Sequence, residues 1–253
     1  MQDLSGRTCL ITGASSGLGA HFARIAGQAG ARLVLGARRK DRLDSLVAEL
    51  EAEGIAAIAI DMDVTDEASV IAAYDAGEAR FGVVDTVIAN AGISTPGRTT
   101  ELSAESFKAL FDTNLLGALL TAREGAKRLI ASGSRESGRG RILLIGSIGS
   151  FTPVPGEVAY SASKAAVASL CRSLAREWIR QGITVNTIQP GYILTELAAD
   201  WFASEGGKAQ IAAFPRRRLQ PIESLDETVL YLLSDASQHM TGSVITLDDG
   251  QSL

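Results

Sequence analysis

Thr12-Gly13-Ala14-Ser15-Ser16-Gly17-Leu18-Gly19 is the stretch of sequence that decides the fold. It follows a short apolar run at residues 8–11 and opens a helical pattern at residues 18–29. Glycines allow a tight turn and a close approach of the backbone to a pyrophosphate, which a helix N-terminus attracts through its amides and dipole. Their spacing differs from the common G-x-G-x-x-G fingerprint, and the Gly-Lys-Ser/Thr ending of a nucleoside-triphosphate loop is missing. The octapeptide therefore predicts a dinucleotide-binding turn and disfavours kinase or ATPase chemistry.

Short apolar runs and amphipathic stretches alternate along the rest of the chain. Such runs are typical of strands buried on both faces of a parallel sheet, and the stretches between them have helical periodicity. We therefore expect one α/β domain over residues 1–253, a doubly wound parallel sheet of about seven strands with helices on both faces. The predicted strands are residues 8–11, 32–35, 56–60, 86–89, 141–145, 184–188 and 244–247, and the predicted helices are residues 18–29, 41–53, 68–81, 104–130, 158–181 and 225–233.

Two segments depart from this alternation. Residues 133–140 are a polar Gly/Ser/Arg stretch, for which we expect a solvated surface loop. Residues 194–223 are long and irregular, and yet they carry Trp201, Phe202 and Phe214. A long, partly apolar excursion after a strand indicates a substrate lid. Packing of this segment against a neighbouring subunit is an equally weighted alternative.

Composition favours a protein that acts on a small molecule. The 253 residues are 46% hydrophobic and 21% charged, which suits one large α/β domain. A net charge of -5 and a pI near 5.2 argue against nucleic-acid or anionic-lipid partners. The sequence has no apolar run of about 18 residues and no secretory pattern at its start, so we expect a cytoplasmic protein without a membrane segment. Cys9 and Cys171 lack metal-ligand spacing, so we expect both in the core and no bound metal.

Tyr160 and Lys164 are the residues that indicate a reaction. They are spaced as i and i+4 in the helix predicted over residues 158–181, so both side chains lie on one helix face. A phenol titrates near pH ~10, and a nearby ammonium is expected to lower its pKa toward neutrality. Ser147, thirteen positions upstream, offers a hydroxyl that can hold a carbonyl oxygen. These side chains predict proton transfer to a carbonyl oxygen, coupled to hydride transfer from a nicotinamide.

The chain resembles the short-chain dehydrogenase/reductase family over nearly its whole length. Besides the glycine-rich turn, it has the family's Asn-Ala-Gly motif after the fourth predicted strand and Pro190-Gly191 after the sixth. The resemblance implies a single-domain Rossmann-like fold and an NAD(P)-dependent enzyme of the EC 1.1.1 type that forms a homotetramer or homodimer. It places Asn114 on a bent helix with a water that relays protons toward Lys164. The implied catalytic residues are Asn114, Ser147, Tyr160 and Lys164.

The resemblance also implies a set of cofactor contacts. Asp63 and Val64 would contact the adenine, Lys164 the nicotinamide ribose, and Thr195 the carboxamide. The full predicted set is Gly13, Ser15, Ser16, Gly17, Leu18, Gly19, Arg38, Arg39, Asp63, Val64, Asn90, Ala91, Gly92, Tyr160, Lys164, Pro190, Gly191, Ile193 and Thr195. Two departures are Ala89, where many relatives have Asn, and Asp249, where many have Gly.

The end of the second predicted strand indicates which dinucleotide is used. An acid there accepts the ribose hydroxyls of NAD, whereas an arginine accommodates the extra phosphate of NADP. This chain has Ala37 followed by Arg38, whose guanidinium can bind phosphate by charge-assisted hydrogen bonds. We therefore expect NADP(H). The alternative is NAD(H), with Arg38 and Arg39 in a solvated patch and Asp41 near the ribose.

The predicted function is hydride transfer between NADP(H) and a ketone or aldehyde, or the matching secondary alcohol, with Tyr160 as general acid or base. Such an enzyme is a carbonyl reductase. The alternatives are a 3-oxoacyl-thioester reductase, an NAD-dependent sugar or steroid alcohol dehydrogenase, and a non-catalytic NADP-binding sensor. Substrate choice is expected to reside in residues 194–223. There, Arg216, Arg217 and Arg218 either recognise a carboxylate or phosphate or are solvated or ion-paired.

Overall fold

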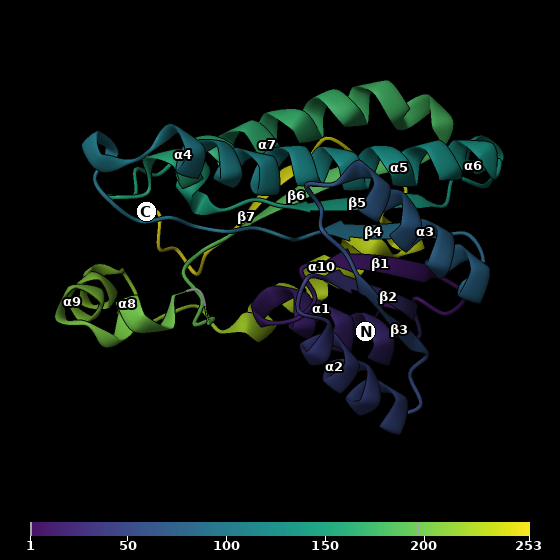
Figure 1. Cartoon of the computed structure of the whole chain (residues 1–253), viewed down its shortest axis with the longest axis horizontal. Helices are drawn as coiled ribbons and strands as arrows, with labels where there is room; N and C mark the ends of the chain where they lie inside the picture. Colours follow the sequence, from purple (N-terminus) through teal and green to yellow (C-terminus); the bar gives the residue numbers. More distant parts are fainter. Residues whose placement is uncertain (1, 197) are drawn as a thin grey trace.

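The computed structural model describes residues 2–196 and 198–253, which form a seven-stranded parallel sheet between two layers of helices (Figure 1). The strand order is β3-β2-β1-β4-β5-β6-β7. It changes direction between β1 and β4, where doubly wound folds open a ligand crevice at the carboxyl ends of the strands. The Rossmann-like fold predicted from the sequence is therefore confirmed. The strands are β1 (Thr8–Thr12), β2 (Arg32–Ala37), β3 (Ala57–Asp61), β4 (Thr86–Ala89), β5 (Gly140–Ile145), β6 (Ile183–Pro190) and β7 (Val244–Leu247).

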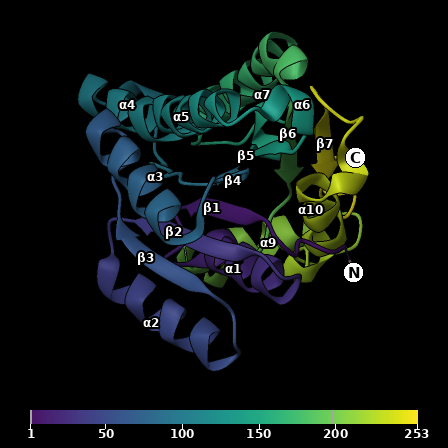
Figure 2. The ribbon, with the colours of Figure 1, turned by 90° about the vertical axis from the view of Figure 1, so that its right-hand side faces the viewer.

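The helices cover both faces of the sheet and enclose two separate cores (Figure 2). Leu33 and Leu35 of β2 pack into one core, and Val34 between them packs into the other. This explains why the strand sequences are apolar at every position. Among the described residues, no helix is both long and apolar enough to span a bilayer. The first layer contains α1 (Gly17–Gln28), α2 (Lys40–Ala52) and α10 (Asp226–Leu233), and the second contains α3 (Glu67–Phe81), α4 (Ala104–Phe111), α5 (Gly117–Ala131), α6 (Ser134–Ser137) and α7 (Val158–Trp178).

The helix predicted over residues 104–130 is interrupted in its middle. A π-helical turn covers Asp112–Leu116, between α4 and α5. Such turns are often found at functional sites. Asn114 lies buried in this turn, where its Oδ1 accepts the Ile93 amide at 2.8 Å and its Nδ2 donates to the Ile93 carbonyl at 2.9 Å. The bend therefore anchors the loop that follows β4, and it agrees with the bent helix that the resemblance implied.

Residues 133–140 are not the solvated loop that their composition predicted. They contain the short helix α6, and Ser134 at its start is buried. The Ser134 hydroxyl donates to the Gln181 carbonyl at 2.6 Å, which ties α6 to the end of the helical segment after α7. The prediction was wrong because backbone groups, rather than water, satisfy this polar side chain.

Residues 194–223, predicted as a lid, contain two short helices, α8 (Ala199–Ala203) and α9 (Glu205–Ala213). Residue 197 lies outside the described residues. Both helices stand apart from the sheet, at the left of Figure 1. Phe202 and Phe214 are buried against Tyr192, at ring-centroid distances of 5.8 and 5.4 Å. The segment therefore packs its two phenylalanines onto the chain that leaves β6, whereas Trp201 is exposed, and its role as a lid stays a prediction.

Candidate active site

The glycine-rich turn lies at the carboxyl end of β1, directly before α1. Gly13 (φ +66°) and Gly17 (φ +53°) have left-handed backbones that other residues rarely adopt. A Cβ atom on Gly19 would lie 2.4 Å from the Gly13 carbonyl oxygen and 2.6 Å from Asn90 Nδ2. The first amides of a helix have no partner within the helix. The glycines therefore let the turn close tightly next to a helix N-terminus that suits a pyrophosphate.

Asn90 joins this turn to the neighbouring strand β4. Its Nδ2 donates to the carbonyls of Thr12, at 2.9 Å, and Gly13, at 3.3 Å. In the opposite direction, Thr12 Oγ1 accepts the amides of Asn90 at 3.0 Å and Ala91 at 3.1 Å. These bonds hold the carboxyl ends of β1 and β4 together where the strand order changes direction. They favour the predicted role of the Asn90-Ala91-Gly92 motif in the cofactor cleft.

The four predicted catalytic residues lie in one neighbourhood beyond the end of β5. Lys164 Nζ donates to the Ile145 carbonyl at 2.8 Å and lies 5.6 Å from the centre of the Tyr160 ring. Ser147 follows β5, and its hydroxyl accepts the Gly149 amide at 3.1 Å. Asn114 is linked to Tyr160 through one intermediate, because its Nδ2 donates to Ser163 Oγ at 3.1 Å and that hydroxyl donates to the Tyr160 carbonyl at 2.7 Å.

Burial controls the electrostatics of this cluster. It lowers the pKa of Lys164 from 10.5 to about 8, because the ammonium is removed from water. Burial also raises the pKa of Tyr160, against the opposing effect of a hydrogen bond with Ser147, and the Glu157 charge raises it further. We predicted from the sequence that Lys164 would lower the Tyr160 pKa. That prediction was wrong, because desolvation of the phenol is the largest cause of its shift and Lys164 is not among the groups that lower it.

Sequence reasoning missed two side chains at the same site, the carboxylate of Glu157 and the phenol of Tyr192. Glu157 is half-buried one helical turn before Tyr160, and the Ser94 hydroxyl donates to its carboxylate at 2.6 Å. Burial raises the pKa of Glu157, and also that of Tyr192. The charge of Glu157 acts on both Tyr160 and Tyr192. The signal that could have revealed Glu157 is its position, three residues before Tyr160 and directly before the helix predicted over residues 158–181.

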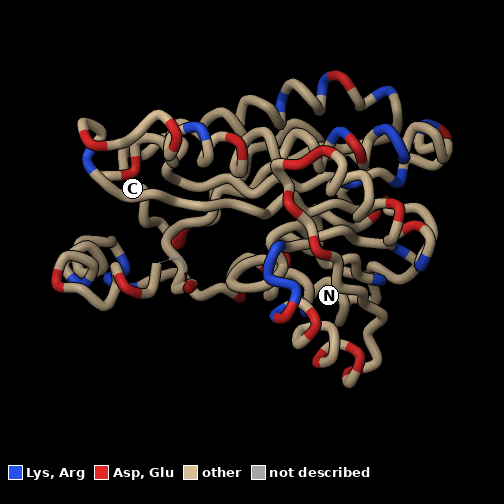
Figure 3. Tube along the Cα trace, in the orientation of Figure 1, with Lys and Arg blue, Asp and Glu red and all other residues tan. Residues whose placement is uncertain are grey.

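Basic side chains, rather than an acid, follow β2. Arg39 Nε donates to the Ser15 hydroxyl at 3.1 Å, and a second Arg39 nitrogen donates to the Ser16 hydroxyl at 2.6 Å. Arg38 is exposed. Figure 3 shows Lys and Arg gathered along the trace where α2 begins. The structure thus brings Arg39, a predicted cofactor residue next to the predicted phosphate-binding Arg38, directly onto the glycine-rich turn.

The other predicted cofactor residues lie along the carboxyl edge of the sheet. A Cβ atom on Gly17 would be 3.6 Å from the Thr195 side chain, so Thr195 borders the glycine-rich turn. Ile193 is buried and forms a bridge with Gln220, and the Gly191 amide donates to the Leu247 carbonyl at 3.0 Å. After β3, Asp63 accepts two hydrogen bonds from Thr65, and Val64 is buried. Their contacts with a dinucleotide stay predictions.

The three arginines of the predicted lid differ in their surroundings. Arg216 and Arg218 form ion pairs with Asp249 at 3.0 and 2.8 Å. Arg217 lies between them with a left-handed backbone, φ +51°. Asp249 also has a left-handed backbone, φ +54°, which is unusual for a residue other than glycine. Of the roles considered from the sequence, ion pairing therefore applies to Arg216 and Arg218.

Comparison with known proteins identifies the family. A family model described as short chain dehydrogenase matches residues 7–206. This chain belongs to the short-chain dehydrogenase/reductase family. It is 34% identical over 248 residues to gluconate 5-dehydrogenase of Gluconobacter oxydans (strain 621H), a match that covers 98% of this chain and 95% of that protein.

Solved structures of short-chain dehydrogenases/reductases share the whole fold. One from Mycobacterium marinum has a TM-score of 0.91 and 34% identity, covering 99% of this chain and 97% of that one. A gluconate 5-dehydrogenase from Burkholderia cenocepacia J2315, in complex with NADP and tartrate, has a TM-score of 0.91 and 32% identity, covering 98% and 96%. The protein is an NAD(P)-dependent oxidoreductase of the EC 1.1.1 type with a small-molecule substrate. Within residues 2–196 and 198–253, no three or more His, Cys, Asp or Glu side chains are grouped to hold a metal ion.

Proposed function

We propose that this enzyme transfers a hydride between NADP(H) and a ketone or aldehyde, or the matching secondary alcohol. The observation that carries the proposal is the arrangement of Ser147, Tyr160 and Lys164 beyond the end of β5, on the same edge of the sheet as the glycine-rich turn. When bound, the nicotinamide supplies or accepts the hydride. The protein's own side chains have to hold the reacting oxygen and move its proton.

The residues that are present fit a dinucleotide with a 2′-phosphate. Side chains at Gly13 and Gly19 would collide with Ala91, Asn90 and the Gly13 carbonyl, so only glycine lets the turn close tightly before the N-terminus of α1, which suits the pyrophosphate. Arg38 and Arg39 would hold the 2′-phosphate through charge-assisted hydrogen bonds. Lys164 would bind the nicotinamide ribose, in keeping with its place beside Tyr160.

The side chains around Tyr160 suit proton transfer to a carbonyl oxygen. Negative charge grows on that oxygen in the transition state, so hydroxyls of Ser147 and Tyr160 that are already in place lower the barrier most at that point. The raised pKa of Tyr160 keeps its proton on the phenol near neutral pH. Tyr160 is therefore a ready proton donor when the enzyme reduces a carbonyl.

Substitution of Tyr160 by Phe tests the acid role, since it removes only the hydroxyl. We expect turnover of ketones and aldehydes to fall by about 10² to 10⁴, with NADPH affinity retained. Tyr231→Phe, in α10 of the opposite helix layer, is the matched control. Normal turnover of the Tyr160→Phe variant, with cofactor binding intact, would contradict the proposal.

The preference for NADP(H) has its own test. We expect Arg38→Asp to reverse the ratio of turnover efficiencies with NADPH and NADH, because a carboxylate at this position repels the phosphate and accepts ribose hydroxyls. An unchanged ratio would contradict the assignment. The result is independent of the Tyr160 experiment, since it compares two cofactors with one substrate.

A second candidate function is oxidation of a polyol or a sugar acid. The similarity to two gluconate 5-dehydrogenases favours it. Glu157 distinguishes neutral polyols from sugar acids as substrates. Its half-buried carboxylate beside Tyr160 accepts hydrogen bonds from hydroxyls and repels an anionic substrate. Screening by nicotinamide absorbance, with neutral polyols and with gluconate, compares the two kinds of substrate directly. A 3-oxoacyl-thioester should be included as the lipid-synthesis alternative.

We further propose assembly as a homodimer or homotetramer through the long helices α5 and α7. The exposed apolar side chains of Leu116, Ile130 and Val158 on or beside these helices support it. Analytical sedimentation tests the assembly, and a monomer at micromolar concentration would contradict it. The cytoplasmic location expected from the sequence stays a prediction. If the purified protein binds NADPH and consumes none across a broad panel of carbonyl compounds, the sensor alternative gains support.

A further inference from the structure

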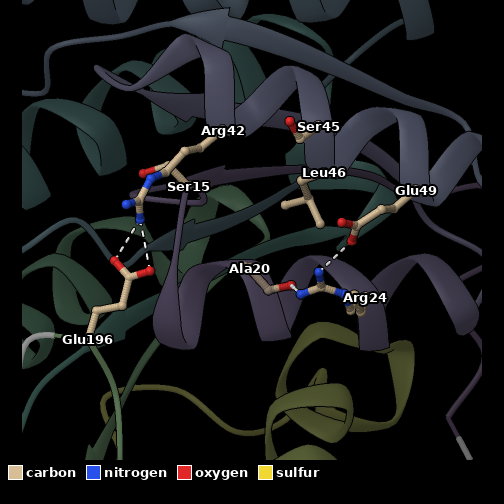
Figure 4. A pocket seen from close by; sticks show the side chains of 8 residues that line it. All are labelled: Ser15, Ala20, Arg24, Arg42, Ser45, Leu46, Glu49 and Glu196. Atoms are coloured by element: carbon tan, nitrogen blue, oxygen red, sulfur yellow. Dashed lines mark hydrogen bonds and ion pairs between the residues drawn. The ribbon is translucent and has the colours of Figure 1, made fainter. Parts of the chain in front are cut away.

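Glu196 binds two arginines beside the glycine-rich turn. One guanidinium nitrogen of Arg42 donates to both carboxylate oxygens of Glu196, at 2.8 and 2.6 Å. Arg39 donates to the same carboxylate at 3.4 Å. Figure 4 shows Arg42 reaching from α2 toward Glu196, with Ser15 next to them. A carboxylate from the segment after β6 thus lies between two basic side chains from the start of the second helix.

Arg39 connects this ion pair to the predicted phosphate site. While one of its nitrogens donates to Glu196, the other two donate to the hydroxyls of Ser15 and Ser16 in the glycine-rich turn. Arg39 also follows Ala37 and Arg38, where the chain has no acid to bind the adenine ribose of NAD. Arg39, which would hold the 2′-phosphate of NADP together with Arg38, is therefore the residue that Glu196 engages.

We propose that Glu196 is an internal competitor of the 2′-phosphate of NADP(H) and so determines how tightly the enzyme binds this cofactor. The inference rests on the proposed preference for NADP(H). Carboxylates and phosphates are bound by the same charge-assisted hydrogen bonds. The Arg39 nitrogen that donates to Glu196 has to release it in order to donate to a phosphate.

The 2′-phosphate is a stronger ligand for Arg39 than Glu196 is. Glu196 therefore lowers the affinity for NADP(H) without preventing its binding. A phosphate monoester carries about -1.5 to -2 charges near neutral pH, whereas Glu196 carries one. The side chains of Arg39, Arg42 and Glu196 are 46%, 44% and 59% exposed. Ion pairs with this exposure are weak, because water screens them. A 2′-phosphate therefore displaces Glu196, and NADP(H) loses a modest part of its affinity in doing so.

Glu196→Gln tests the proposal through binding alone. We expect the Kd of NADPH, measured by fluorescence titration or calorimetry, to fall by about 3- to 5-fold, the upper part of the range for loss of a weak exposed ion pair. The Kd of NADH should stay within about 2-fold, because NADH has no 2′-phosphate to compete. Adenosine 2′,5′-bisphosphate and AMP should repeat this difference, since the effect belongs to the adenine end of the cofactor.

Glu49→Gln is the matched control. Glu49 lines the same surface depression and accepts a hydrogen bond from Arg24 at 2.7 Å, and it is on the far side from Arg42 and Glu196 (Figure 4). This variant removes the same charge as Glu196→Gln. Because Glu49 pairs with Arg24 rather than with Arg39, the affinities for NADPH and NADH should both stay unchanged. An NADPH affinity that is unchanged or weaker in Glu196→Gln would overturn the proposal. Equal tightening for NADPH and NADH would also overturn it.

The affinities of the wild-type protein for NADPH and NADH distinguish a failure of this proposal from a failure of the proposed function. If the wild-type protein binds NADH more tightly than NADPH, the cofactor assignment fails, whereas a selective gain for NADPH in Glu196→Gln still supports the competition. If the wild-type and the variant both fail to bind either dinucleotide or adenosine 2′,5′-bisphosphate, both proposals are overturned. If the wild-type prefers NADPH and the variant does not differ from it, only the competition is wrong.

Discussion

Replacement of Lys164 by Met should stabilise the folded protein near pH 7 while it abolishes function. Lys164 is buried, and its Nζ donates to the Ile145 carbonyl at 2.8 Å. Burial lowers its pKa from 10.5 to about 8, which corresponds to about 3 kcal/mol, since one pKa unit is about 1.4 kcal/mol. This is the cost of keeping the ammonium charged in the folded protein. Loss of the hydrogen bond to Ile145 offsets about 1 to 2 kcal/mol of that gain. We therefore expect the Lys164→Met variant to unfold with a free energy higher by about 1 to 2 kcal/mol at pH 7.

The pH dependence of this difference is the sharper test. Between about pH 8 and 10.5 the unfolded chain keeps the Lys164 proton and the folded chain loses it, so the stability of the wild-type protein rises with pH. The wild-type protein should gain about 2 kcal/mol on the variant between pH 7 and pH 9.5. The other titrating groups are common to both proteins and cancel in the difference. The advantage of the Met variant should thus vanish or reverse.

Urea unfolding at pH 7.0 and 9.5, at one protein concentration and without cofactor, measures both values. Lys40→Met is the control, because Lys40 is a half-exposed partner of Asp44 and its removal should change stability by less than about 0.5 kcal/mol at either pH. A Lys164→Met variant that is less stable than the wild-type protein at pH 7 would refute the reasoning. A difference that does not change between the two pH values would also refute it, since burial of a charge would then not be its cause.

Three further substitutions test other parts of the structure. Gly19→Ala should weaken NADPH binding more than tenfold in a calorimetric titration, because its Cβ atom would lie 2.4 Å from the Gly13 carbonyl oxygen; normal affinity would exclude a role of this tight turn in binding. Arg7→Met should cost about 3 to 5 kcal/mol of unfolding free energy, since the buried Arg7 guanidinium binds Thr86 and Asp235, whereas Arg24→Met, which breaks an exposed pair with Glu49, should cost less than about 1 kcal/mol. Asp249→Gly should leave the melting temperature almost unchanged, since a left-handed position suits glycine, and yet raise KM for carbonyl substrates severalfold through loss of the contacts with Arg216 and Arg218; an unchanged KM would separate this contact from substrate binding.

The sheet and the cofactor end of the site could be predicted from the sequence because their determinants are local. Leu33, Val34 and Leu35 are apolar in succession because each faces one of two cores, and such runs have few alternatives to a buried strand. The glycine-rich turn follows from local backbone geometry, since Gly13 and Gly17 have left-handed backbones and a Cβ atom on Gly19 would lie 2.4 Å from the Gly13 carbonyl oxygen. The apolar strand and the glycine-rich turn can therefore be predicted without knowledge of residues distant in the sequence.

The remaining features depend on contacts between distant segments. The pKa of Tyr160 was predicted in the wrong direction because its burial depends on packing that spacing along a helix does not encode. Ser134 was expected to be solvated, and its partner Gln181 is 47 positions away. Likewise, Glu196 meets Arg39 and Arg42 across more than 150 positions, so nothing in the local sequence marks it.

The arginines at the cofactor end and Glu157 at the catalytic end carry opposite charge, and this limits where an anionic group of a substrate can lie. At the cofactor end, Arg39 and Arg42 attract anions and are held by Glu196. At the catalytic end, Glu157 stands one turn before Tyr160, half-buried, so that an anion there meets repulsion without full screening by water. A phosphate-bearing cofactor is therefore guided to the glycine-rich turn and away from the catalytic tyrosine. By the same reasoning we expect a substrate's carboxylate to lie away from Glu157. The variant Glu157→Gln should accordingly improve kcat/KM for an anionic substrate more than for a neutral one, and an equal effect on both would show that the charge of Glu157 plays no part in selection.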